Sequence, residues 1–139
     1  MPRVDRILAL AALTFAGCSG STEAGSGAPA QVVVTVVTGI GAPTTSVGFP
    51  TTLPHGGSTL QVSGLDSLGR TMTLDPVRYR FDVTPAAVAG FYFVTPTTNT
   101  TLGIAVLQAA ASLPFTWKLT DVTTSRIVVG PTLTNVLLQ

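Results

Sequence analysis

A strict alternation of apolar and charged residues between positions 77 and 83 constrains the fold of this chain more than any other segment. The alternating residues are Val77, Arg78, Tyr79, Arg80, Phe81, Asp82 and Val83. Successive side chains of a strand point to opposite faces of a sheet, so the pattern predicts a strand with one buried and one solvated face.

The same reasoning predicts further short strands along the chain. Shorter alternations occur at residues 59–63, 71–74 and 115–120, and apolar runs occur at 32–37, 88–94, 102–107, 127–129 and 133–138. Gly and Pro separate these segments at positions typical of turns, as at 41–43, 54–57 and 130–131. The chain also contains 23 threonines, and β-branched residues favour strands. We therefore expect an all-β antiparallel sandwich of about seven to nine strands.

Residues 102–111 fit either a strand or a helix. The apolar run at 102–107 has the length of a strand, whereas the Ala-rich continuation at 108–112 also suits a helix. We expect a strand here, with a helix as the alternative.

The first 17 residues have the organisation of a secretory signal peptide. Arg3 and Arg6 provide a positive start, and residues 7–17 form an uncharged stretch that ends in small residues. This stretch is too short to cross a membrane, which requires about 20 apolar residues. The sequence therefore predicts a signal peptide at 1–17.

Residues 15–18, Phe-Ala-Gly-Cys, resemble a bacterial lipobox, in which a peptidase cuts before the cysteine and the cysteine receives acyl chains such as palmitate. The resemblance implies a lipoprotein whose lipidated residue is Cys18, and two or three acyl chains anchor a protein stably. Ser19 after the cysteine resembles an outer-membrane sorting signal. The alternative is an ordinary signal peptide cut near Ala16 or Gly20, which would leave Cys18 as a free thiol.

Composition divides the rest of the chain into a linker and one domain. Residues 18–30 comprise Cys18 and a Gly/Ser-rich segment that predicts a flexible tether. Residues 31–139 have the length of a single domain with a two-layer core. Cys18 is the only cysteine, so no disulfide forms within the chain.

Two segments in the middle of the chain resemble bacterial Ig-like domains of the Big type. Residues 56–70 match a Gly-led strand that ends in an Asp-x-x-Gly hairpin, and residues 79–89 match a strand followed by a Pro turn and a Val-Ala strand. Asp66 can accept backbone hydrogen bonds in that hairpin while Gly69 adopts a positive φ. The resemblance implies an Ig-like β-sandwich over residues 31–139. It departs from the family where Tyr79 or Phe81 replaces a strand Trp.

Composition and motifs favour a protein that is not an enzyme and needs no cofactor. Apart from Arg3, Arg6 and Asp5, five basic and five acidic residues remain, so no basic stripe is present to bind nucleic acid. The single histidine, His55, lies in a Pro-His-Gly-Gly segment and is expected to be an exposed turn residue. No nucleophile elbow, phosphate-binding loop or cysteine pair occurs.

The aspartates are expected to cap turns rather than bind metal. Asp66, Asp75, Asp82 and Asp121 are separated in the sequence, and no Asp-x-Asp run occurs. Calcium requires six to eight oxygen ligands, so a calcium site or an envelope hydrolase based on these carboxylates is the less favoured alternative.

Three side chains are the candidate ligand-binding residues. Arg78 and Arg80 leave the same strand face and could bind carboxylates or sugar hydroxyls, or could belong to a solvated face. Tyr92 lies between Phe91 and Phe93, with its ring on the opposite face from theirs. It could be an exposed platform on which a sugar stacks, or a packed aromatic with a polar tip.

These features predict a non-enzymatic binding or structural module, lipid-anchored at the cell envelope and outside the cytoplasm. The membrane is one partner, through the acyl chains, and an envelope protein or glycan is the other. The alternative is an accessory subunit that docks on an envelope complex without a ligand of its own.

Overall fold

The computed structural model describes residues 27–139. The predicted signal peptide, Cys18 and the linker up to residue 26 lie outside the described residues. The described part consists of strands and turns and contains no helix, which confirms the all-β prediction.

The described chain forms eleven strands. In order they are β1 (Gln31–Thr38), β2 (Thr44–Val47), β3 (Thr52–Leu53), β4 (Gly56–Leu65), β5 (Thr71–Met72), β6 (Tyr79–Thr84), β7 (Ala87–Val88), β8 (Tyr92–Thr98), β9 (Thr101–Val106), β10 (Ala110–Asp121) and β11 (Arg126–Leu138). The count exceeds the predicted seven to nine because β3, β5 and β7 each have two residues, too few for an alternation to be recognised.

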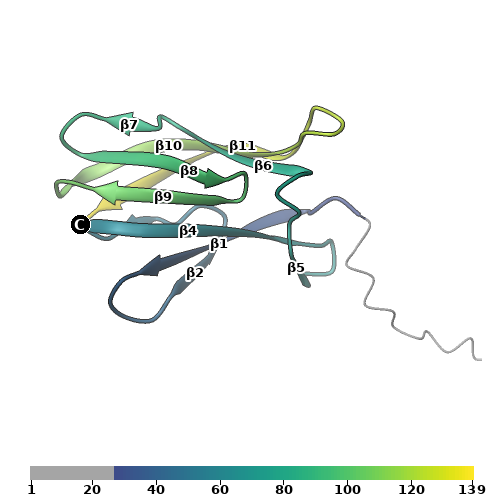
Figure 1. Ribbon diagram of the computed structural model, residues 1–139, viewed down its shortest axis with the longest axis horizontal. Coiled ribbons are helices and arrows are strands. Elements are labelled where there is room, and N and C mark those ends of the chain that lie inside the picture. The colour runs from purple at the N-terminus through teal and green to yellow at the C-terminus, as the bar shows by residue number, and fades with distance from the viewer. Residues whose placement is uncertain (1–26) are drawn as a thin grey trace, which may run out of the picture.

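The strands form two sheets that pack face to face (Figure 1). The larger sheet has seven strands in the order β2-β1-β4-β9-β8-β7, with β5 paired to β4. The smaller sheet has four, in the order β3-β11-β10-β6. Every strand pair is antiparallel apart from β3 and β11, which are parallel. The prediction of an antiparallel-dominated β-sandwich is therefore confirmed.

A single apolar core lies between the two sheets. The larger sheet contributes side chains such as Val34 and Leu60, which are fully buried. Phe49, between β2 and β3, stacks against Phe115 of β10 at 5.5 Å between ring centroids and against Phe81 of β6 at 6.4 Å. Burying a large apolar side chain stabilises a fold by about 1.5–3 kcal/mol, so this core holds the sheets together without a disulfide.

The strand expected at 77–83 begins two residues late. Tyr79 and Phe81 point into the core as predicted, and Val83 is half-buried, but Val77 is 78% exposed. Asp75 causes this, because its carboxylate accepts a hydrogen bond from the Val77 amide (2.8 Å) and its carbonyl accepts one from the Tyr79 amide (2.8 Å). The capped turn holds residues 76–78 outside β6.

The two strands expected at 127–129 and 133–138 are one continuous strand, β11. Gly130 and Pro131 were expected to form a turn, but they lie within β11, where the register with β10 shifts. Gly130 has a φ of +85°, and a Cβ there would lie 2.8 Å from the Trp117 carbonyl oxygen. The glycine allows the backbones of β10 and β11 to approach closely at this irregularity.

Other segments differ from prediction in their bounds. Residues 102–111, for which a helix was the alternative, form β9 and the start of β10 with a short loop between them. The run at 88–94 is divided between β7 and β8 by a turn at Gly90. In the alternation at 71–74 only Thr71 and Met72 pair, with β4, although Leu74 is buried.

The hairpin between β4 and β5 forms as the sequence predicts. The Asp66 carboxylate accepts hydrogen bonds from the Leu68 amide (2.8 Å) and the Arg70 amide (2.9 Å). Gly69 has a φ of +77°, the positive value expected for it. The turn residues therefore determine this hairpin locally.

The larger sheet also binds the end of the predicted linker. Pro29 is buried, and the Ala30 amide donates to the Leu65 carbonyl at 2.7 Å. A Cβ on Gly64 would lie 2.9 Å from Pro29 Cβ and 2.8 Å from Met72 Cγ, so Pro29 fits into space left by the glycine. The chain therefore joins the domain beside β5.

Candidate functional site

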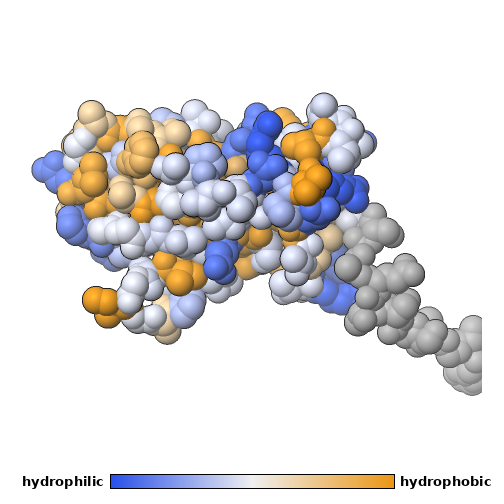
Figure 2. Space-filling view, in the orientation of Figure 1, coloured by the Kyte–Doolittle hydropathy of each residue, from blue (hydrophilic) through white to orange (hydrophobic). Residues whose placement is uncertain are grey.

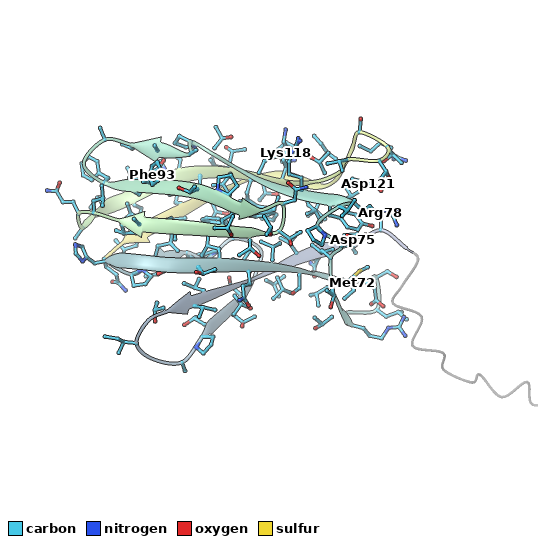
Figure 3. All side chains as sticks on the ribbon, in the orientation of Figure 1. Met72, Asp75, Arg78, Phe93, Lys118 and Asp121 are labelled. Atoms are coloured by element: carbon cyan, nitrogen blue, oxygen red, sulfur yellow. The ribbon has the colours of Figure 1, made fainter. Side chains whose placement is uncertain are left out.

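Arg78, the first predicted binding residue, is held by a buried carboxylate. Its Nε donates to Asp121 Oδ2 at 3.0 Å, and its guanidinium lies over the Tyr79 ring at 5.0 Å from the centroid. Asp121 is only 3% exposed and also accepts hydrogen bonds from the Thr123 amide (3.0 Å) and hydroxyl (2.6 Å). Figure 3 shows Arg78 and Asp121 together at one end of the sandwich. The cluster ties the turn before β6 to the end of β10.

This cluster makes the stability of the folded domain fall at acid pH. The Thr123 hydroxyl and the Arg78 guanidinium lower the pKa of the Asp121 carboxyl, against the opposing effect of burial. A carboxyl whose pKa is lowered by folding stabilises the folded state at pH values above its pKa in the unfolded chain, which is about 4. This stabilisation is lost as the pH falls through the pKa of the folded state. We expect Asp121→Asn to lower the Tm by several degrees at pH 7, with the difference from wild type closing below about pH 4.

Thermal unfolding followed by circular dichroism between pH 2 and pH 8 measures this effect. The matched control is Asp82→Asn, which alters an exposed ion pair and should change the Tm little. A Tm difference between Asp121→Asn and wild type that stays constant down to pH 2 would contradict the assigned role of the charge.

Arg80, the second predicted binding residue, pairs with its neighbour on β6. Its Nε donates to both carboxylate oxygens of Asp82, at 3.0 and 3.1 Å. Lys118 of β10 faces Asp82 across the strand pair. Arg80, Asp82 and Lys118 therefore form a solvated sheet face. Arg78 and Arg80 donate to different carboxylates, those of Asp121 and Asp82.

Tyr92, the third predicted binding residue, is not at the surface. It is 1% exposed, its ring centroid lies 4.7 Å from that of Phe115, and its hydroxyl donates to the Pro85 carbonyl at 3.2 Å. Burial raises the pKa of the Tyr92 hydroxyl. Of its two alternatives, the packed aromatic with a polar tip is therefore the one observed.

The exposed ring of this segment is Phe93. It is 52% exposed, because the turn at Gly90 sets the phase of β8 so that Tyr92 and Val94 point inward and Phe93 and Thr95 outward. The sequence indicates this orientation, because Thr95 and Thr97 lie two and four residues after Phe93 and therefore share its sheet face, and threonines are typical of the solvated face. Phe93 is therefore the site residue that sequence reasoning missed.

The larger sheet carries no charged side chain in any of its seven strands. Its outward positions hold small or neutral residues, among them Thr35, Val37, Gly57, Thr59, Gln61, Thr95, Thr101, Gly103 and Ala105. Figure 2 faces this surface, which is mostly pale, with apolar side chains gathered on the side where β8 begins and β9 ends. The charged residues of the described chain lie on the smaller sheet and in turns.

Two open grooves meet at one end of this surface. One, of about 440 Å³, lies over β1 and β4 and is lined by Val37, Thr38, Gly39, Gly57, Ser58 and Thr59. The other, of about 410 Å³, shares Thr38, Gly39 and Gly57 and adds Ile40, Pro54 and His55. The strand register places Phe93 opposite Ala105, and Ala105 opposite Gly57. We call these grooves and Phe93 together the Phe93 surface.

Ile40 and His55 line the second groove of the Phe93 surface, and Leu107 lies beside His55 at its border. His55 is an exposed turn residue, as predicted, and its Nε2 lies 3.3 Å from the Leu107 carbonyl oxygen. Ile40 is 93% exposed and Leu107 is 58% exposed. Within residues 27–139 no group of three or more His, Cys, Asp or Glu side chains is placed to hold a metal ion.

The Phe93 surface lies at the opposite end of the molecule from the point where the chain joins the domain. Figure 3 shows Phe93 at one end and Met72, Asp75, Arg78 and Asp121 at the other. Pro29 packs beside Met72 and Gly64. The Phe93 surface is therefore at the end of the domain remote from Pro29, which we call the free end.

Comparison with known proteins assigns no relative to this chain. No family model, curated protein or solved structure matches it. In the described part, no helix has the length and apolar character needed to cross a membrane.

Proposed function

We propose that this chain is a lipid-anchored, non-enzymatic binding module of the cell envelope. The observation that carries the proposal is the uncharged Phe93 surface, which combines an exposed ring with two grooves at the free end of the domain. Recognition surfaces commonly combine an exposed aromatic side chain with a concave neighbourhood. The module contacts its ligand there and is held to the membrane at its other end.

Anchoring is the second part of the proposal. The acyl chains on Cys18 hold the protein in the membrane, which we propose to be the outer membrane, and the residues after Cys18 act as a tether. Because Pro29 and Ala30 are held by the larger sheet, the tether comprises the ten residues 19–28, and a flexible chain of that length has a root-mean-square length of about 17 Å. The tether joins the domain beside Met72, so the Phe93 surface lies at the end of the domain remote from the attachment point and stays accessible as the domain reorients.

The proposal includes the Big-type, Ig-like family for the sandwich. The hairpin in which Asp66 accepts two backbone hydrogen bonds and Gly69 has a positive φ supports that resemblance. The fold leaves the loops between β1 and β2 and between β3 and β4 beside the Phe93 surface.

Docking on an envelope complex is the alternative function. Ile40 and Leu107 support it, because they are exposed apolar side chains beside the same grooves. Large apolar side chains in solvent often mark a protein contact. In that case the protein partner would cover Ile40 and Leu107 and the module would have no ligand of its own.

Recovery of envelope components by the full lipidated chain, purified in detergent, tests the proposal. We expect recovery of a component that wild type retains to fall about tenfold with Phe93→Ala, since removing one interfacial ring costs roughly 1.4 kcal/mol, which is a factor of ten in affinity. The matched control is Leu133→Ala, because Leu133 is an apolar residue of the smaller sheet that is 64% exposed, against 52% for Phe93.

The same assay distinguishes the alternatives. Leu107→Asp should abolish recovery of a docked protein complex, whereas Leu133→Ala should recover it as wild type does. Equal recovery by wild type, Phe93→Ala and Leu107→Asp would refute the Phe93 surface as a binding site, and chemical conversion of the retained component would refute a non-enzymatic role.

A further inference from the structure

The absence of charge from the larger sheet restricts the chemistry of a ligand on the Phe93 surface. All the charged residues of the described chain lie outside its seven strands. An anionic or cationic ligand placed on this sheet would lose hydration without gaining a counter-charge, which is unfavourable. A ligand that is polar but neutral meets no such cost. Of the envelope polymers, neutral polysaccharides have this character.

The shape of the surface suits an extended chain that crosses the strands. Ala87, Phe93, Ala105 and Gly57 form one outward row on β7, β8, β9 and β4, as the strand registers show. Strands lie roughly 4.8 Å apart, so the Phe93 ring stands roughly 10 Å from Gly57. The one side chain between them is the methyl group of Ala105, and Gly57 itself carries only a hydrogen, so the row is a flat track that leads from the ring into the grooves.

The groups along this track match the two sides of a sugar ring. The face of an aromatic ring carries negative partial charge and attracts C–H groups, which one face of a pyranose ring presents. In the next row, Thr95 and Thr59 lie on either side of Gly103, and their hydroxyls can donate to and accept from sugar hydroxyls. The Phe93 ring can therefore stack on a sugar ring while Thr95 and Thr59 form hydrogen bonds with its hydroxyl groups.

We propose that the Phe93 surface binds a neutral polysaccharide, with one sugar ring on Phe93 and the chain running past Ala105 into the groove at Gly57. This inference rests on the proposed function, because it names the ligand class of the same surface. A protein partner is the competing occupant, and the experiment below separates the two.

Binding of the full lipidated chain, in a non-ionic detergent, to immobilised polysaccharides tests this inference. The neutral probes are dextran, a β-1,4-glucan and a mannan, and the acidic probes are polygalacturonate and heparin. Wild type should bind at least one neutral probe saturably and neither acidic probe. Phe93→Ala should weaken that binding about tenfold, the loss expected for one stacked ring, and Phe93→Trp should retain it.

Gly57→Val tests the groove independently of the ring. A Cβ on Gly57 would meet no atom within 4 Å, so the Gly57→Val variant should fold normally, with the valine side chain filling the groove. We expect Gly57→Val to weaken neutral-probe binding about as much as Phe93→Ala, that is, about tenfold. Leu133→Ala, on the smaller sheet, should bind like wild type.

Three outcomes would overturn the inference. They are the absence of binding to every neutral probe, binding to the acidic probes alone, and neutral-probe binding that either Phe93→Ala or Gly57→Val fails to reduce. If no polysaccharide binds but recovery of an envelope protein depends on Phe93, the glycan assignment fails and the binding module stands. If Phe93→Ala changes neither assay, both proposals fail.

Discussion

Phe81→Asp is expected to abolish folding of the domain. Phe81 is buried between the Phe49 and Trp117 rings, at 6.4 and 5.9 Å between centroids, and faces Leu119 on β10. Removing a buried phenylalanine ring costs about 3–5 kcal/mol, and an unpaired buried carboxylate costs several more. Domains of this size are stable by only about 5–15 kcal/mol. Circular dichroism should therefore show loss of the cooperative thermal transition.

Thr84→Asp is the matched control for this prediction. Thr84 is exposed on the same strand and faces Thr116 of β10, so the added carboxylate stays in water. We expect its Tm to lie within a few degrees of wild type, as for most exposed substitutions. A soluble Phe81→Asp variant with a cooperative transition near the wild-type Tm would show that the inward face of β6 is wrongly assigned.

Cys18→Ser is expected to move the protein from the membrane fraction to the soluble fraction. Each buried CH₂ of an acyl chain contributes about 0.8 kcal/mol, and serine at this position carries no acyl chain. Cell fractionation followed by immunoblotting measures the shift, and incorporation of labelled fatty acid should disappear with the same substitution.

The control for Cys18→Ser is Ser21→Ala, which changes the tether and leaves the lipobox intact. It should remain in the membrane fraction with normal fatty-acid labelling. If Cys18→Ser is still labelled, the lipobox assignment is wrong. If mature wild type is soluble and Cys18 reacts with a maleimide, the signal is an ordinary one and the anchoring proposal fails.

Features that depend on neighbouring residues were predictable from the sequence. The hairpin at Asp66 and Gly69 is one example, since the side chain that accepts the turn amides lies within four residues of them. The inward positions of Tyr79 and Phe81 are another, because the two-residue period of a strand determines which side chains share a face. His55 in its exposed turn is a third.

Features that depend on contacts between distant segments were not predictable. Gly130 and Pro131 have the composition of a turn, yet the pairing of β11 with β10 holds them within a strand. The two-residue strand β3 exists because Leu53 and Thr52 pair with Leu138 and Leu137, more than eighty positions later in the chain. No local pattern encodes such a pairing.

The sequence left Tyr92 with two alternatives, an exposed platform or a packed aromatic, and the strand phase decides between them. Tyr92 packs against Phe115 and the neighbouring Phe93 ring is at the surface. Arg78 and Arg80 have the chemistry of ligand-binding residues, and each donates its Nε to a carboxylate, of Asp121 and Asp82 respectively. Asp121 is 43 residues from Arg78, so the sequence pattern did not pair them.

The amino-acid sequence by itself determined that the described chain is all β, because alternation, β-branched residues and turn residues act over short distances. Only the tertiary structure decided that the charged residues lie outside the larger sheet, that Phe93 and Gly57 share one row with Ala105 between them, and that this surface lies at the other end of the domain from Pro29. Strand order brings Gly57, Phe93 and Ala105 together, and strand order results from the joint packing of two sheets around one core.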